Sequence, residues 1–277
     1  MSGEENHFRL PVSGRVVCVR PLCGTEDLLL AESSIGDLGL AIRLADNLTR
    51  DIEGVVLDWG GLAVTDLDAF VVFLRQMLIG DRIQADVKCG APECGQRFDL
   101  NFGLHQFLAH HAPSPPTRVC RGWLLQPGQE PGWYQLAPAS AEAESLSERV
   151  SFRLPTPNDQ LAVRGEPNAE DELARRCLQP AWVPARLRHR AEAVMEAMAP
   201  CLACELQAVC PECGLATPIY FEPRHFCLRE LRDRAASVYA DVDLLARRYH
   251  WSEDQILALP RTRRAAYVGL ARSAESN

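Results

Sequence analysis

Two short pairs of cysteines lie far apart in the chain within the same local sequence pattern. Cys89 and Cys94 belong to the segment C-G-A-P-E-C-G, and Cys210 and Cys213 belong to C-P-E-C-G. A tight turn presents two thiolates from one side, and the glycine after the second cysteine relieves strain in that turn. Zinc bound by thiolates prefers four sulfurs in a tetrahedron. The sequence therefore predicts one structural Zn²⁺ ion bound by Cys89, Cys94, Cys210 and Cys213.

Other interpretations of the cysteines remain open. A buried cysteine often acts as a small apolar side chain, and a single C-x-x-C pair can be redox-active. The repeated context favours a metal site, and four thiolates leave no open position for a catalytic water. Cys201 and Cys204 could replace Cys89 and Cys94 as ligands, although the intervening segment 205–209 has the pattern of a strand that leads into Cys210.

Composition restricts the class of protein. The chain has 277 residues, of which 47% are hydrophobic, so it can bury a substantial core. Its net charge of −8 disfavours a nucleic-acid-binding protein, despite short basic runs at 186–190 and 261–264. The clustered cysteines and the polar first residues indicate a reducing, cytoplasmic location. The sequence contains no uninterrupted apolar run of about 18 residues, so we predict no membrane-spanning segment.

Local patterns predict a mixed fold. Alternating residues indicate strands over 82–88, 97–102 and 217–221, and a helix is expected to open after each cysteine turn, near His105 and His225. Thr65 and Asp66 predict the start of an earlier helix, and Thr156-x-x-Asp159 predicts another. The expected fold class is α+β: helix-rich with small β elements, two zinc-knuckle or zinc-ribbon halves joined in one four-cysteine site, and a long C-terminal helix with a helical tail.

A second repeated segment supports a division into halves. F-R-L-P occurs at residues 8–11 and again at 152–155, each time ahead of one cysteine pair. We therefore expect an N-terminal α+β half over 1–137 with the first cysteine turn and a linker over 138–148. A second half over 149–227 contains the other cysteine turn, and a C-terminal helical tail spans 228–277.

Apolar residues after the second cysteine pair follow a regular 3-4 spacing from Leu228 to Tyr249. This spacing predicts one long helix with a continuous apolar face. That face packs against the following helices, which are expected to begin at Ser252 and Pro260, or it binds a protein partner; short connections favour internal packing. The partner interpretation assigns the contact to Leu231, Val238, Val242, Leu245, Trp251 and Tyr267.

No recognisable catalytic motif is present. The sequence contains no phosphate-binding glycine loop, no H-E-x-x-H helix and no nucleophile elbow. We therefore predict a protein that is not an enzyme.

Several of these motifs together resemble the T-even-type phage base-plate protein family, which is associated with baseplate hub assembly and occurs in contractile injection-system clusters. The resemblance rests on Phe8-Arg-Leu-Pro, on Thr65-x-Leu-Asp68 with Gly80-Asp81-Arg-Ile, and on the two cysteine turns. It also rests on the motif Y-H-W-S-E-x-x-I-x-x-L-P-x-x-R-R-x-x-Y over 249–267. It covers nearly the whole chain, and the longer spacing from Cys89 to Cys94 departs from a two-residue knuckle.

The resemblance implies an assembly factor or minor structural protein of a contractile-tail baseplate, in the cytoplasm or within the assembled particle. Its partners would be hub, wedge or spike proteins, and the four matched cysteines would hold a structural metal. Two other hypotheses compete with it. A zinc-ribbon nucleic-acid-binding regulator would bind DNA in a salt-sensitive way, and a thiol oxidoreductase would need a reactive thiol of low pKa.

Overall fold

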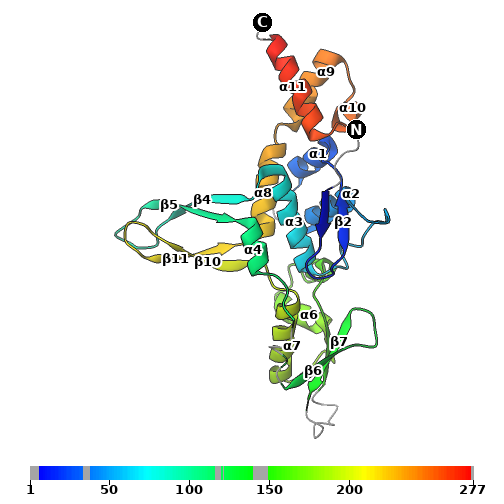
Figure 1. Ribbon diagram of the computed structural model, residues 1–277, viewed down its shortest axis with the longest axis vertical. Helices are drawn as coiled ribbons and strands as arrows, with labels where there is room; N and C mark the ends of the chain where they lie inside the picture. The colour runs from blue at the N-terminus through cyan, green and yellow to red at the C-terminus, as the bar shows by residue number, and fades with distance from the viewer. Residues whose placement is uncertain (1–5, 34–37, 116–119, 121, 140–148, 276–277) are drawn as a thin grey trace.

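The protein combines helices with small antiparallel sheets, in agreement with the α+β class expected from its sequence. The computed structural model describes residues 6–33, 38–115, 120, 122–139 and 149–275. In Figure 1 the molecule is elongated, with the C-terminal helices at one end and the strands β6 and β7 at the other. The strands β4, β5, β10 and β11 form an arm that projects sideways from the middle of the molecule.

The N-terminal part contains a three-stranded sheet, four helices and a hairpin. The sheet has the order β1-β2-β3, so β1 is an edge strand. The elements in chain order are β1 (Asn6–Arg9), β2 (Val16–Val19), α1 (Gly24–Glu32), α2 (Leu38–Leu48), β3 (Thr49–Asp51), α3 (Val64–Ile79), β4 (Arg82–Lys88), β5 (Arg97–Gly103) and α4 (Leu104–His110).

The rest of the chain forms a four-stranded sheet in the order β6-β7-β8-β9, a second hairpin and further helices. Its sheet and helices are β6 (Trp123–Pro127), β7 (Trp133–Pro138), β8 (Val150–Arg153), α5 (Pro157–Ala162), α6 (Ala169–Cys177), β9 (Leu178–Gln179) and α7 (Ala185–Met198). The elements that follow are β10 (Cys204–Val209), β11 (Ala216–Phe221), α8 (Pro223–Ala235), α9 (Val238–Tyr249), α10 (Glu253–Leu257) and α11 (Arg261–Glu275).

The order of elements occurs twice among the described residues. A strand pair, two helices, a third strand, one helix, a hairpin and a final helix follow one another from β1 to α4, and again from β7 to α8. In both copies the second strand pairs with the first and the third. The F-R-L-P segments do not occupy equivalent places in this order, because Phe8 lies in the first strand of one copy and Phe152 in the second strand of the other. The two F-R-L-P segments therefore do not align with each other in the structural repeat.

Among the described residues, three apolar clusters form the interior, and the largest joins segments that lie far apart in the sequence. The largest joins the N-terminal sheet and helices to Phe221, Leu228 and Leu231. A second lies between β7–β8 and α6–α7, and a third joins α9, α10 and α11. The boundary predicted at residues 227 and 228 falls inside α8, and the cysteine-turn half and the N-terminal half therefore share one core. The linker predicted over 138–148 lies mostly outside the described residues, which stop at 139 and resume at 149.

Two helix starts show how local signals compare with the structure. The capping box predicted at Thr156 and Asp159 is confirmed at α5. The cap predicted at Thr65 is wrong, since α3 begins at Val64 with Ala63 as its N-cap. The hydroxyl of Thr65 instead donates a hydrogen bond to the carbonyl of Pro200. Asp66 accepts hydrogen bonds from the backbone N–H groups of Val12 and Ser13, so its carboxylate anchors a remote turn.

The prediction of one long C-terminal helix over 228–249 is also wrong, because the helix is interrupted at Ala236 and Ser237, between α8 and α9. The apolar spacing continues across the break, but the two segments bury their apolar residues in different places. Leu228 and Leu231 belong to the N-terminal core, whereas Leu245 packs against α10 and α11. One continuous apolar pattern therefore serves two separate cores.

Candidate metal centre

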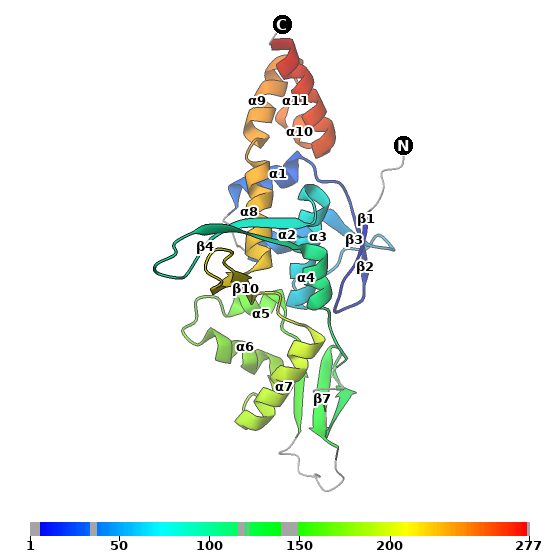
Figure 2. The same ribbon diagram turned by 60° about the vertical axis from the view of Figure 1, so that its left-hand side comes forward.

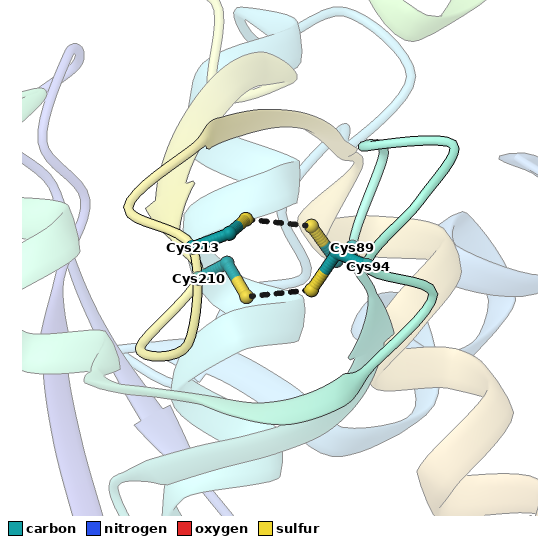
Figure 3. Close-up of side chains that lie close together, drawn as sticks. All are labelled: Cys89, Cys94, Cys210 and Cys213. Atoms are coloured by element: carbon teal, nitrogen blue, oxygen red, sulfur yellow. Dashed lines mark hydrogen bonds between the residues drawn. The ribbon is translucent and has the colours of Figure 1, made fainter.

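The four predicted ligand residues meet at the end of the projecting arm. Each hairpin carries one cysteine pair in the turn that joins its two strands, and the two turns face each other (Figure 1; Figure 3). Cys89 and Cys94 approach from the β4–β5 hairpin, while Cys210 and Cys213 approach from the β10–β11 hairpin. The structure thus brings together all four thiols that the sequence singled out.

The two turns share the same backbone hydrogen bond, but their first cysteines lie at different positions relative to it. In the second turn the N–H of Gly214 donates to the carbonyl of Cys210, and in the first the N–H of Gly95 donates to the carbonyl of Ala91. Gly95 and Gly214 have φ values of +59° and +73°, which glycine adopts without the steric cost that a side chain would bring. Ala91 therefore occupies the place of Cys210, and Cys89 lies two residues earlier. This shift accounts for the longer spacing from Cys89 to Cys94.

The four sulfurs form one compact group. The Sγ atoms of Cys89 and Cys213 are 3.6 Å apart, and those of Cys94 and Cys210 are 3.9 Å apart. All four lie within 4.8 Å of one another, and this cluster can hold a metal ion. A disulfide has an S–S bond of about 2.05 Å, so neither pair is bonded. Cys89 and Cys210 are buried, Cys94 is half-buried and Cys213 is exposed.

Backbone N–H groups point at the sulfurs. The N–H of Ala91 lies 3.4 Å from the Sγ of Cys89. Donation from the N–H of Cys213, with further donation from Glu212 and the neighbouring thiols, lowers the pKa of Cys210 to about 7. Although the N–H of Gln96 acts to lower the pKa of Cys94, burial and the adjacent thiols raise it to about 12. Thiolates this close together repel one another, and a bound cation offsets that repulsion.

Contacts between the hairpins hold the arm together beyond the sulfurs. The N–H of Gly90 donates to the Oγ1 of Thr217 on the opposite hairpin. At the base of the arm, Phe221 makes edge contacts with Phe102 and Phe107 at ring-centroid distances of 5.2 and 5.3 Å. These aromatic rings belong to the N-terminal core or pack against it. The cluster is therefore supported by a rigid base that both hairpins share.

The alternative ligands lie outside this cluster. Cys204 is the first residue of β10 and pairs with Phe221, at the end of the hairpin opposite to its turn. Cys210 lies six positions after Cys204 along an extended strand, which corresponds to a distance of about 20 Å. Cys201 is exposed in the segment that follows α7. Strand geometry thus keeps Cys201 and Cys204 away from the thiols of the turns.

The residues predicted to bind a partner are mostly inside the protein. Leu231, Val238 and Leu245 have no exposed surface. Val242 is half-buried against the cluster of α9–α11. Trp251 and Tyr267 are half-buried in a three-ring group, where Trp251 stacks on Tyr249 at 4.9 Å and meets the edge of Tyr267 at 5.0 Å. A partner contact on these helices would have to use their solvent-facing side chains.

Comparisons with known proteins do not extend this assignment. No family model, no curated protein and no solved structure matched the chain. Among the described residues, none of the helices combines the length and the apolar character needed to cross a membrane.

Proposed function

We propose that Cys89, Cys94, Cys210 and Cys213 bind one structural Zn²⁺ ion. The observation that carries this proposal is the spacing of the sulfurs. A tetrahedral zinc ion with Zn–S bonds of about 2.3 Å places its sulfurs about 3.8 Å apart. Two contacts across the cluster measure 3.6 and 3.9 Å, and all four sulfurs lie within 4.8 Å of one another, so little rearrangement is needed. The two hairpins then act as zinc-ribbon halves that share one ion.

The chemistry of this donor set supports a structural role. Four thiolates fill the coordination shell of zinc and leave no position for a substrate or an activated water. The ion would link the β4–β5 hairpin to the β10–β11 hairpin, in which Cys94 and Cys210 are 116 positions apart along the chain. We propose that the protein is not an enzyme and that the metal maintains the shape of the arm.

We further propose that the chain is an assembly factor or a minor structural protein of a contractile-tail baseplate. The resemblance to the T-even-type base-plate protein family supports this role, chiefly through the motif at 249–267. In the structure this motif forms the α10–α11 unit, with a capping box at Ser252 and three aromatic rings in contact. Its partners would be hub, wedge or spike proteins, met in the cytoplasm or in the assembled particle.

Metal analysis tests the first proposal. We expect the full chain, purified under reducing conditions, to contain one zinc ion per molecule when its metal content is measured by inductively coupled plasma mass spectrometry. Substitution of Co²⁺ for zinc should give the intense ligand-to-metal charge-transfer absorption bands of a tetrahedral four-thiolate site. Protein that is folded, reduced and free of zinc, and that fails to bind added zinc, would rule out the metal centre.

Genetic removal tests the second proposal separately. The gene should lie beside genes for sheath, tube and spike proteins, and its deletion should leave tails without complete baseplates in electron micrographs. Re-expression of the chain should restore them. Normal, functional tails in the deletion strain would disprove the assembly role. Salt-sensitive binding to DNA would instead favour the regulator hypothesis.

A further inference from the structure

The edge strand β1 offers unpaired backbone groups to a partner. In antiparallel pairs, successive residues point their N–H and C=O groups alternately toward and away from the neighbouring strand. Leu10 faces β2, since its N–H donates to Arg15 and its carbonyl accepts from Gly14. Phe8 therefore also faces β2, while His7 and Arg9 point their backbone groups to the free side of the strand.

No described residue forms a backbone hydrogen bond with His7 or Arg9 on that free side, and both residues are exposed. Open sheet edges accept additional strands, and although β1 is short, no described strand covers its free side. The unpaired donors and acceptors here repeat at the spacing of an extended peptide. Only an extended backbone presents complementary groups at that spacing.

An apolar cavity lies beside the same strand. Its volume is about 360 Å³. It is lined by Phe8 and Arg9 of β1, Ala69 and Gln76 of α3, and Leu108 and Ala109 of α4, together with neighbouring residues. In Figure 1 α3 lies between α4 and the strands β1 and β2, and Figure 2 shows α4 beside these strands from another side. The cavity thus has α3 as its floor, with the edge strand on one side and α4 on the other.

We propose that an extended segment of a protein partner binds here as a fourth strand on β1 and places one bulky apolar side chain in the cavity. The backbone of the segment would pair with the free groups of His7 and Arg9. The apolar lining would select a side chain of the size of leucine or phenylalanine, and the strand pairing would fix the direction of the chain. This proposal goes beyond the baseplate role and does not depend on the zinc ion.

Two pairs of variants separate the cavity from the strand edge. Ala109→Trp fills the cavity from an exposed position of α4, and Gln106→Trp puts the same ring on the same helix outside the cavity lining. Arg9→Pro removes the free N–H without breaking the ladder to β2, and Arg9→Ala removes the side chain but keeps that N–H. Circular dichroism and thermal unfolding would first establish that all four variants fold.

Binding is measured with nonapeptides selected on the full chain from a displayed library that has leucine or phenylalanine at its centre. Fluorescence anisotropy should show at least about tenfold weaker binding to Ala109→Trp than to the natural chain, whereas Gln106→Trp should bind within about twofold of it. Arg9→Pro should bind about five- to tenfold more weakly than Arg9→Ala, the size of one lost backbone hydrogen bond, because both variants lack the side chain that lines the cavity and only Arg9→Pro also lacks the free N–H. Bound peptide should also protect the amides of His7 and Arg9 from hydrogen exchange.

Three outcomes would overturn the proposal. The library yields no binding peptide, or the selected peptides bind Ala109→Trp and Arg9→Pro as tightly as the natural chain. Alternatively, the free chain sediments as a dimer that Arg9→Pro dissociates, in which case a second copy occupies the edge. Zinc content and baseplate assembly are measured independently, so failure here leaves the proposed function standing.

Discussion

At the scale of single residues, buried charges attach the helical tail to the body. Arg264 on α11 contacts Asp27 on α1 and Asp241 on α9, and Arg261 lies 2.8 Å from Asp27. Arg264 is 3% exposed and Asp27 is fully buried. In the sequence Arg261 and Arg264 belong only to a short basic run at 261–264. Its true role was hidden, because the carboxylate partners of Arg264 come from two distant helices.

Removal of Arg264 should destabilise the protein strongly. Arg264→Leu leaves the buried Asp27 with a single cationic partner, and loss of one member of a buried ion cluster costs about 3–5 kcal/mol. Arg248→Leu on α9 is the control, because Arg248 is exposed and should change the stability by less than about 0.5 kcal/mol. Urea unfolding measures both. Equal stability of the two variants would contradict the proposed attachment.

The carboxyl of Asp68 should make stability depend on pH. Burial raises its pKa from 3.8 to about 6, and the nearby guanidinium of Arg224 offsets only part of this effect. Below pH 3.8 both the folded and the unfolded chain hold the proton, so the group has no effect. Between pH 3.8 and about 6 the folded chain keeps the proton that the unfolded chain releases. The free energy of unfolding therefore falls by about 3 kcal/mol as the pH rises across this range.

Asp68→Asn removes this penalty, because the amide stays neutral at every pH. We therefore expect the stability of the variant, relative to the natural chain, to rise between about pH 4 and about pH 7 by up to about 3 kcal/mol. Urea unfolding at several pH values gives this difference, and comparison of the two chains removes the effect of pH on the thiols. A constant difference across this range would contradict the raised pKa.

Loss of one thiol should remove the metal. Cys210→Ser takes away a buried ligand, so zinc should fall to well below one ion per molecule and the thermal midpoint should drop, because metal binding is coupled to folding. Cys201→Ser changes an exposed cysteine outside the cluster and should keep both properties. Elemental analysis and calorimetry distinguish the two variants. Full zinc content in Cys210→Ser would place the metal elsewhere.

At the scale of elements, the hairpins were predictable and the helix break was not. Alternating residues and the cysteine turns marked β4, β5 and β11 in the sequence, since these signals are local. The repeat even extends further than the turns, because in both hairpins the spacing from the second cysteine through Phe102 and Phe107, or Phe221 and Phe226, is the same. The break between α8 and α9 carries no glycine or proline, so only its packing into two cores reveals it.

The glycine that follows the second cysteine pair should matter more than a glycine in a helix. Gly214 has a φ of +73°, so Gly214→Ala should cost about 1–2 kcal/mol and weaken zinc binding. Gly269 lies in α11 with open space around its Cα, so Gly269→Ala should stabilise the chain by about 0.5–1 kcal/mol. Chemical unfolding with zinc competition measures both effects. A Gly214→Ala variant that is as stable as the natural chain, or more stable, would refute this account of the turn.

At the scale of the whole molecule, one predicted metal centre connects segments that share the N-terminal core. The sequence could indicate this connection, because each cysteine pair carries a strong local pattern. It could not indicate the cavity beside β1, whose lining comes from β1, α3, α4 and Leu202 and follows no pattern along the chain. Contacts assembled from several remote segments become visible only in the fold.

Removal of zinc should loosen the arm before the rest of the molecule. Without the ion, the exposed strands β4, β5 and β10 keep few contacts beyond the aromatic base. Limited proteolysis with a chelator should therefore cut first within 82–102 and 204–220, while the cores around Phe152 and Leu245 stay protected. Added zinc should reverse the sensitivity. Cleavage spread evenly over all three cores would contradict a local role of the metal.

The separation of the two cysteine turns also constrains how the protein is made. During translation, Cys89 and Cys94 leave the ribosome long before Cys210 and Cys213 have been synthesised. The early pair must wait as free thiols, open to oxidation or to capture by other soft metals, until the late pair arrives. At the proposed zinc site, the ion can therefore join the two hairpins only after Cys213 has been synthesised, and the early thiols stay reduced until then only in reducing surroundings.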